Sequence, residues 1–117
     1  MVKVLVCLKR KEGTTADEFH SYWRERHGPL FLSIPAISRN VRKYVQSHSI
    51  HGPLPGFHGA ESAFDGFAEI WFDDLIDLEK TFTDPGYIGT IRQDEMKFLD
   101  LKKCRLSIVE ETVMYTE

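Results

Sequence analysis

Hydrophobic and polar residues follow two different periods along this chain. The first run, VKVLVCL at residues 2–8, is β-branched and almost entirely apolar, which is typical of a strand covered on both faces. Residues 40–50 alternate between two faces, FAEIWF at residues 67–72 is a second compact apolar run, and the segment from Lys103 onward alternates in its first half. We therefore expect four strands.

The period changes to three and four residues in the segments between these strands. Thr15 and Glu18 match the Thr-x-x-Glu capping box, so a helix should begin there. The stripe of this helix that should face the core consists of Ala16, Phe19, His20, Trp23 and His27. We expect the helix to end at Gly28-Pro29, because proline disfavours the helical state of the residue before it. Another helix should begin at Asp73-Asp74, and a further helical segment should run from Asp84-Pro85 to about residue 98.

The predicted elements come in the order β-α-β-β-α-β. Two main helices on one face of a four-stranded antiparallel sheet make an α+β, ferredoxin-like fold. We expect a single domain over residues 1–117, because a chain of this length builds one core. The other sheet face then needs a cover, and the same face of a second copy would provide it in a homodimer.

Charge and cysteine content narrow the possible partners. The 15 basic and 18 acidic residues leave a net charge of −3 without a basic run, so we expect no nucleic-acid partner. The chain has no apolar stretch of membrane-spanning length and no signal-peptide pattern at its start, so we expect no membrane partner and a cytoplasmic location. Cys7 and Cys104 lack zinc-site spacing. They should be reduced and lie near each other, without a bond, on neighbouring strands.

Four blocks of sequence together carry a family resemblance. They read FHSYWRERHGPL, YVQSH, FAEIWFDDL and MKFLDLKKCRLSIVEE, and the Tyr-Trp-x-x-x-His-Gly-Pro-Leu block is the most specific. From Val2 to about Glu111 the chain resembles an EthD-domain protein. The resemblance implies a protomer of the dimeric α+β barrel superfamily, whose two sheets face each other in a homodimer.

The resemblance defines the fold far better than the chemistry. EthD is named for a gene cluster that degrades ethyl tert-butyl ether, and fungal relatives accompany polyketide pathways. Related families include polyketide cyclases, small monooxygenases, muconolactone isomerases and haem-binding peroxidases. The loop of residues 51–62 looks longer than the core motifs of the family, and we expect it at the mouth of a pocket.

His27 and His48 are the candidate catalytic residues. If Tyr44, Gln46 and His48 point toward the first helix, polar groups and aromatic rings meet in one place, as they do in small-molecule pockets. Imidazole titrates near neutral pH and suits proton transfer. We therefore expect histidine acid–base chemistry without a cofactor on an aromatic or polyketide-like metabolite. The candidate substrate-binding residues are Trp23, Tyr44, Gln46, Phe19 and Tyr22.

Each candidate also has a purely structural interpretation. His27 in the last turn of a helix would gain about 0.3–1 kcal/mol from the helix dipole and could act only as a cap. His48 could be a half-buried histidine bonded to the backbone, the aromatic residues could be core, and His20 could be solvated. No metal site is expected, because seven residues separate His20 from His27, about 10 Å along a helix. Asp94 and Glu95 are unusual, since acidic residues late in a helix are mildly unfavourable.

Three functions stay open at this point. The first is a small homodimeric enzyme that catalyses dehydration, decarboxylation, cyclisation or oxygenation. The second is a binding or carrier protein of the same fold without turnover. The third is a haem- or flavin-assisted oxidoreductase, because a single histidine suffices as an axial haem ligand.

Overall fold

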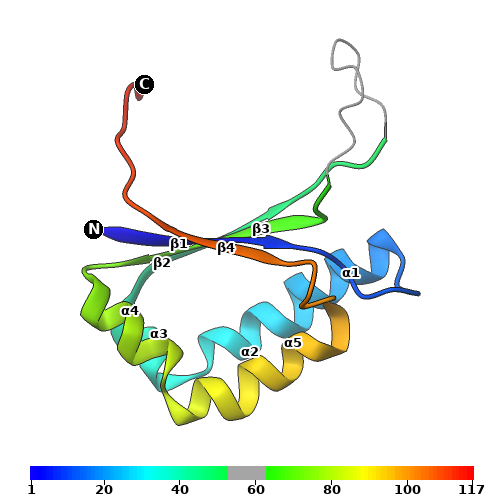
Figure 1. Cartoon of the computed structure of the whole chain (residues 1–117), viewed down its shortest axis with the longest axis horizontal. Coiled ribbons are helices and arrows are strands. Elements are labelled where there is room, and N and C mark those ends of the chain that lie inside the picture. The colour runs from blue at the N-terminus through cyan, green and yellow to red at the C-terminus, as the bar shows by residue number, and fades with distance from the viewer. Residues whose placement is uncertain (53–62) are drawn as a thin grey trace.

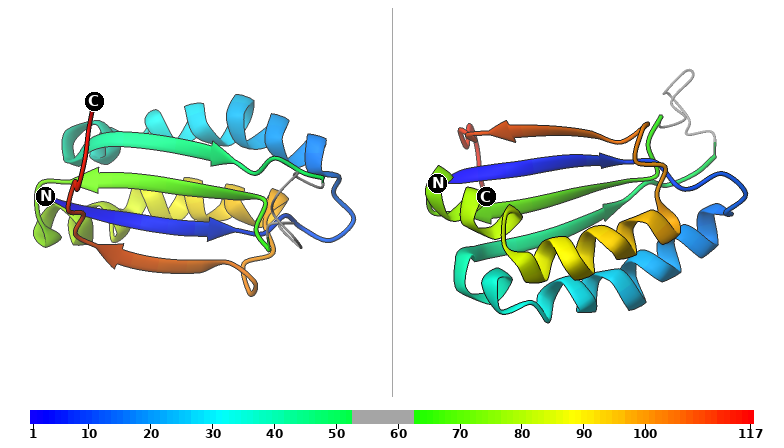
Figure 2. Two further views of the ribbon diagram at one scale, coloured as in Figure 1. Left: turned by 90° about the horizontal axis from the view of Figure 1, so that it is seen from above. Right: turned by 60° about the horizontal axis from the view of Figure 1, so that its bottom comes forward.

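The centre of the molecule is an antiparallel sheet of four strands. The structure is a computed structural model that describes residues 1–52 and 63–117. The strands are β1 (Val2–Leu8), β2 (Val41–His48), β3 (Gly66–Phe72) and β4 (Arg105–Val109), in the spatial order β2-β3-β1-β4. The helices of the described residues all lie against one face of this sheet (Figures 1 and 2). The predicted α+β, ferredoxin-like fold is confirmed.

The first helix runs further than the sequence predicted. It consists of α1 (Ala16–Tyr22), the π-helical turn η1 (Trp23–His27) and α2 (Gly28–Leu32). It begins as expected, at the capping box of Thr15 and Glu18. The expected end at Gly28-Pro29 is wrong, because Gly28 has helical dihedral angles and donates its N–H to the carbonyl of Trp23, five residues earlier. Pro29 is the second residue of α2, which follows directly after the π-helical turn within the continuous helix.

Gly28 allows a strand side chain to approach the helix closely. A Cβ atom at this position would lie 2.8 Å from Nε2 of Gln46. Gln46 donates from this nitrogen to the Trp23 carbonyl over 3.0 Å, so that carbonyl accepts both the π-turn N–H and a side chain of β2. Gly28 therefore leaves the space in which Gln46 connects the sheet to the helix, and the helix continues past the glycine.

Strand β2 contains a bulge that changes the face of its first residue. The register between β2 and β3 shifts between Val41 and Lys43. Val41 consequently packs with the core under the helices, whereas simple alternation had grouped it with Lys43. Beyond the bulge the alternation holds, and Tyr44, Gln46 and His48 point toward the first helix as predicted.

The second half of the chain begins its helices where the sequence predicted. The remaining helices are α3 (Pro35–Asn40), α4 (Leu75–Phe82), η2 (Tyr87–Ile91) and α5 (Arg92–Phe98). The Asp74 carboxylate accepts the N–H of Asp77 and caps α4. The Asp84 carboxylate accepts the N–H groups of Gly86 and Tyr87 and caps the helix of η2 and α5. Residues 29–37 are helical for most of their length.

The core lies between the sheet and the helices. On β1, Val4 and Leu8 are buried under the helices, while Lys3, Leu5 and Cys7 point to the opposite face. The largest fully buried side chains are those of Trp23, Phe19, Phe72 and Ile37. Burying aromatic side chains of this size dominates the hydrophobic stabilisation of a small domain.

The two cysteines lie on opposite sides of the sheet. Both are free thiols. Cys7 shares the face that points away from the helices, whereas Cys104 packs against the cluster that contains Leu8, with its Sγ 3.3 Å from the carbonyl oxygen of Asp100. The predicted neighbouring positions are confirmed for the backbone, because Cys7 pairs with Arg105, the residue after Cys104, but the two side chains point to opposite faces.

Two further expectations concern segments rather than side chains. No helix within residues 1–52 or 63–117 combines the length and the apolar character that crossing a bilayer requires. The predicted loop of residues 51–62 falls outside the described residues from position 53 onward. His51 and Gly52 are the described residues of that loop, and His51 contacts His20.

Candidate functional site

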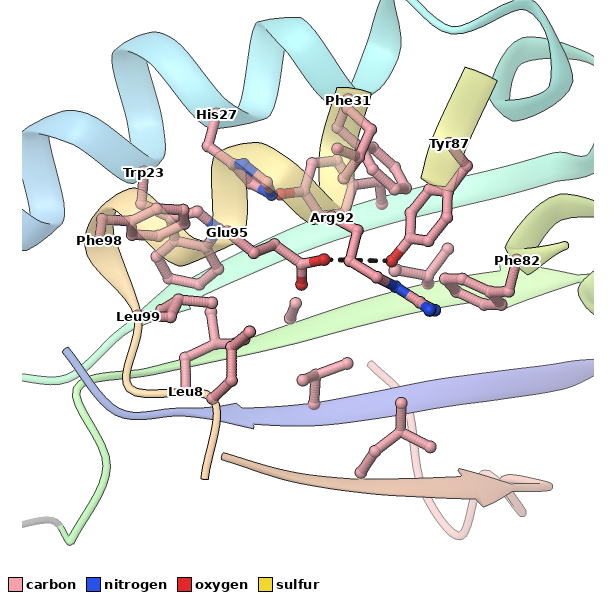
Figure 3. Close-up of a pocket in the computed structure, with 17 residues that line it drawn as sticks. Leu8, Trp23, His27, Phe31, Phe82, Tyr87, Arg92, Glu95, Phe98 and Leu99 are labelled. Atoms are coloured by element: carbon pink, nitrogen blue, oxygen red, sulfur yellow. Dashed lines mark hydrogen bonds between the residues drawn. The ribbon is translucent and has the colours of Figure 1, made fainter. Parts of the chain in front are cut away.

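A cavity of about 390 Å³ lies between the sheet and the two long helices (Figure 3). Most of its wall is aliphatic or aromatic, and its polar or charged groups are few. The polar lining residues are His27, Tyr44, Tyr87, Arg92 and Glu95. The main aromatic and aliphatic lining residues are Trp23, Phe31, Phe98, Leu8, Ile70 and Leu106. An apolar cavity with a few convergent polar groups is typical of small-molecule sites.

His27 forms a buried pair with an aspartate from the other long helix. Its Nδ1 lies 2.8 Å from Oδ2 of Asp94, and both side chains are almost completely buried. The Tyr22 hydroxyl donates to the other carboxylate oxygen of Asp94. Because a carboxylate only accepts hydrogen bonds, Nδ1 of His27 must carry the proton. In the neutral ring, Nε2 is then the unprotonated nitrogen.

The surroundings keep this pair in one protonation state at neutral pH. Burial lowers the pKa of His27 and outweighs the opposing hydrogen bond and charge of Asp94. Burial acts against ionisation of Asp94, but the hydrogen bonds from Tyr22 and His27 prevail and hold the pKa of Asp94 below its ordinary value. At pH 7 the site therefore holds a neutral imidazole beside an aspartate anion.

Glu95 brings a second titratable group to the cavity. Burial raises the pKa of Glu95 to about 7, against the opposing charge of Arg92 and the hydrogen bond from Tyr87. The Tyr87 hydroxyl lies 3.5 Å from the Glu95 carboxylate, and burial also raises the pKa of Tyr87 (Figure 3). A carboxyl group with a pKa near 7 is half protonated at neutral pH, so it can donate or accept a proton there.

We expect Glu95 to make the stability of the protein depend on pH. Its pKa is higher in the folded state than the ordinary value of 4.5, so its stabilising contribution is fully present below pH 4.5 and is lost as the pH rises through about 7. Relative to Glu95→Gln, the wild type should lose on the order of 3 kcal/mol of unfolding free energy across this window. Urea unfolding of both proteins from pH 4.5 to 8 measures the difference. Glu79→Gln on exposed α4 is the control, and parallel curves for wild type and Glu95→Gln would contradict the expectation.

The structure distributes the predicted site residues over three places. Trp23, His27 and Tyr44 line the cavity. Tyr22 contacts the Asp94 carboxylate, and Phe19 is fully buried behind Trp23. Gln46 and His48 are not among the cavity-lining residues described, but they connect to it through Tyr44 and Trp23. The structure also places His27 in the middle of a continuous helix, so its interpretation as a C-terminal cap is wrong.

Four residues of the site escaped the sequence-based prediction of function. They are Tyr87, Arg92, Asp94 and Glu95, all on the helix of η2 and α5. The two acidic residues gave a signal, since acidic side chains late in a helix are unfavourable unless they have partners. Their partner His27 lies 67 residues away from Asp94 in the sequence, so only the folded chain could identify the pair.

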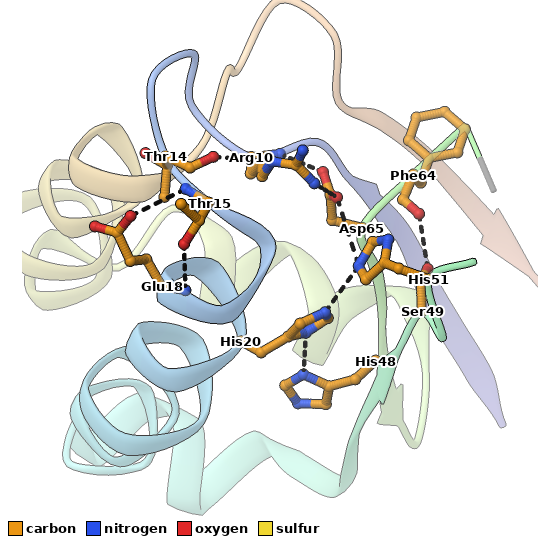
Figure 4. Close-up of polar contacts among 10 residues, drawn as sticks. All are labelled: Arg10, Thr14, Thr15, Glu18, His20, His48, Ser49, His51, Phe64 and Asp65. Carbon is orange, nitrogen blue, oxygen red and sulfur yellow. Dashed lines mark hydrogen bonds and ion pairs between the residues drawn. The ribbon is translucent and has the colours of Figure 1, made fainter. Parts of the chain in front are cut away.

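A second polar cluster joins β1, α1 and the end of β2 outside the cavity (Figure 4). Three imidazole rings are linked edge to edge, with His20 lying 2.7 Å from His48 and 3.0 Å from His51 between their nearest nitrogens. The buried carboxylate of Asp65 pairs with Arg10 at one end of the cluster. Among the described residues, no group of three or more histidine, cysteine, aspartate or glutamate side chains has the geometry of a metal site.

Fold and site together define a class of protein, namely a small ferredoxin-like α+β protomer with an aspartate–histidine pair on an apolar cavity. The chain belongs to the EthD domain family, whose model matches residues 11–102. The predicted family is thereby confirmed.

Solved structures agree with this assignment. An ethyl tert-butyl ether d (EthD) family protein from Bacillus halodurans is 25% identical, with 96% of this chain and 99% of that chain covered and a TM-score of 0.72. An EthD-like protein from Ralstonia eutropha is 22% identical over 98% of this chain and 95% of that one, with a TM-score of 0.71. A dimeric ferredoxin-like protein of unknown function from Bacteroides fragilis is 16% identical over 94% and 95%, with a TM-score of 0.66. None of the curated proteins matches this chain.

Proposed function

We propose that the protein is a cofactor-free acid–base enzyme that acts on an aromatic or polyketide-like small molecule. The observation that carries the proposal is the buried His27–Asp94 pair at the wall of an otherwise apolar cavity. A neutral imidazole in a fixed tautomer, held by a carboxylate, is the arrangement that a general base requires. Trp23, Phe31 and Phe98 supply flat apolar surfaces for a ring system.

The geometry supports removal of a proton from an enolisable position. Nε2 of His27 takes the proton, and Asp94 stabilises the imidazolium that forms. Glu95, protonated in about half of the molecules at pH 7, donates a proton to a departing or re-forming oxygen of the substrate. Dehydration and ring closure both need such a base and such an acid in one cavity, and we favour these reactions.

Turnover of candidate substrates tests this proposal. We expect the purified protein to consume at least one member of a panel of anthrones, hydroxyaromatic acids and lactones, followed by absorbance and mass spectrometry. The matched inactive variant is Asp94→Asn, which keeps the shape of the side chain and should lose turnover. An absorption spectrum of the protein as isolated tests the haem- or flavin-assisted alternative, because either group absorbs visible light.

A binding or carrier protein of the same fold is the second candidate. The observation in its favour is the predominance of apolar groups in the cavity wall, which suits retention of a hydrophobic ligand. A carrier would bind members of the panel and release them unchanged. Replacement of His27 would then alter affinity alone, which separates a carrier from an enzyme.

We also propose that two copies associate through the sheet face that no described helix covers. Half-buried apolar side chains lie on this face, at Leu5, Val45 and Phe67. Figure 2 shows the face from above, and Figure 1 shows the C-terminal segment leaving β4 on the same side. The Bacteroides fragilis structure of the same fold is described as dimeric. A second copy would remove these apolar groups from water.

The mass of the protein in solution tests the dimer. At micromolar concentration, light scattering should give twice the 13.6 kDa of one chain. Leu5→Lys places a charge in the proposed interface and should shift the mass toward 13.6 kDa. Met96→Lys, an exposed apolar position on α5, is the matched control and should stay dimeric. A wild-type mass of one chain would refute the dimer.

A further inference from the structure

A directional chain of hydrogen bonds runs from the histidine cluster to the wall of the cavity. Its members in order are His51, His20, His48, Gln46 and Tyr44. Successive partners lie between 2.7 and 3.0 Å apart. Figure 4 shows the three imidazole rings between α1 and the end of β2. The last member, Tyr44, lines the cavity that contains His27.

Gln46 determines in which direction the hydrogen bonds of this series are donated. Its Nε2 lies 3.0 Å from two acceptors, the Trp23 carbonyl and the Tyr44 hydroxyl oxygen, and its Oε1 lies 2.9 Å from Nε2 of His48. The Trp23 carbonyl can only accept, so the amide nitrogen must face it and the amide cannot be turned over. His48 must therefore donate from Nε2 to Gln46.

This assignment fixes the tautomers of the histidines. Burial lowers the pKa values of His20 and His48, so both rings are neutral at pH 7. A neutral His48 that donates from Nε2 must accept at Nδ1, so His20 donates from its Nδ1. Nε2 of His20 then accepts from His51. Each hydrogen bond of the series is therefore donated toward the cavity, from His51 through His20, His48 and Gln46 to the Tyr44 oxygen.

The hydrogen bonds of this series leave the hydroxyl proton of Tyr44 free to be donated. Its oxygen already accepts the amide N–H of Gln46. Burial raises the pKa of Tyr44, while hydrogen bonds from Gln46 and Trp23 to its oxygen act in the opposite direction. Among the described residues, Tyr44 donates no hydrogen bond of its own. Its O–H is therefore available to a ligand in the cavity.

We infer that Tyr44 is a catalytic residue that donates a hydrogen bond to the carbonyl oxygen of a ketone substrate, with Gln46 and His48 as its positioning residues. The inference rests on the proposed function and names its substrate class. When the C–H bond beside the carbonyl breaks, its proton goes to Nε2 of His27. The electron pair moves to the carbonyl oxygen, and the resulting enolate accepts the Tyr44 hydrogen bond. A preorganised donor of this kind stabilises the developing oxyanion.

A matched pair of probes tests the donor without turnover. 1-Tetralone and tetralin share one bicyclic skeleton, and only the ketone offers an oxygen. We expect the wild type to bind 1-tetralone more tightly than tetralin and to lower the carbonyl stretching frequency of the bound ketone in infrared spectra. In Tyr44→Phe the affinity ratio should fall about tenfold, as expected for one lost hydrogen bond, and the frequency shift should disappear.

Gln46→Glu is the sharper variant because it reverses the last hydrogen bond, between residue 46 and Tyr44, without removing the phenol. The carboxylate places an acceptor beside Tyr44, which then donates away from the cavity. The frequency shift should disappear here as it does in Tyr44→Phe. Tyr115→Phe removes an exposed phenol outside the cavity, and the carbonyl frequency should stay as in the wild type.

The outcomes separate this inference from the proposed function. A carbonyl frequency that is the same in wild type and Tyr44→Phe, or no binding of 1-tetralone, overturns the inference. A shift that depends on Tyr44 and Gln46, with no turnover of any ketone, supports the hydrogen bond from Tyr44 to a bound ketone but refutes the enzyme, and with it the catalytic role of Tyr44. The shift together with turnover supports both.

Discussion

Replacing His27 by glutamine should reduce kcat by about 10²–10⁴-fold while the protein stays folded. The physical reason is that glutamine has no group that accepts a proton at neutral pH. Its amide can still donate to Asp94, which therefore does not become an unpaired buried charge. Turnover of the substrate found in the panel, together with thermal unfolding of both proteins, measures the two effects separately.

Asp94→Asn is a second test of the proposed mechanism, through the partner of His27. An asparagine amide can donate to Nδ1 of His27, which would move the ring proton to Nε2 and leave no base facing the substrate. We expect a loss comparable to that of His27→Gln, and the double variant should be no worse than either single one. Losses that multiply would show that the two residues do not act as a unit. Unchanged turnover in both single variants would rule out His27 as the base.

Replacing Phe19 by alanine should destabilise the protein by about 3–5 kcal/mol, the usual cost of removing a large aromatic side chain from a core. Phe19 is 0% exposed and packs against Trp23 and Phe98, with ring centroids 5.5 and 5.8 Å away. Because both neighbours also line the cavity, the change should loosen its wall. Urea unfolding at constant pH gives the free energy.

A surface leucine on the same helix provides the comparison. Leu32 is 55% exposed, so Leu32→Ala should change the unfolding free energy by less than about 0.5 kcal/mol. If Phe19→Ala proved equally mild, the packing of the first helix against α5 would not be the main support of the cavity.

The local signals in the sequence predicted where elements begin. The capping box at Thr15 and Glu18 and the caps at Asp74 and Asp84 act within a few residues, so their effect does not depend on the rest of the fold. The same local logic failed at Gly28. That glycine looked like a stop signal, but its purpose depends on Gln46, which approaches from a strand 18 residues later.

The pattern of strands and helices also determined the fold, because alternation and helical periodicity state which face of each element is buried. The family was identified by the resemblance of four sequence blocks and not by this pattern. The alternation correctly directed Tyr44, Gln46 and His48 toward the first helix. The function assigned to these side chains stays a prediction, since their contacts show position and hydrogen bonding and the variants above measure their roles.

Only the tertiary structure decided which groups share the cavity and in which protonation state. The sequence by itself marked His27 as a candidate and Asp94 and Glu95 as unusual, but a pair 67 residues apart has no sequence spacing to reveal it. The neutral imidazole of His27 and the raised pKa of Glu95 likewise arise from burial. Burial depends on which helices close over the sheet, and that is a property of long-range packing that local sequence cannot contain.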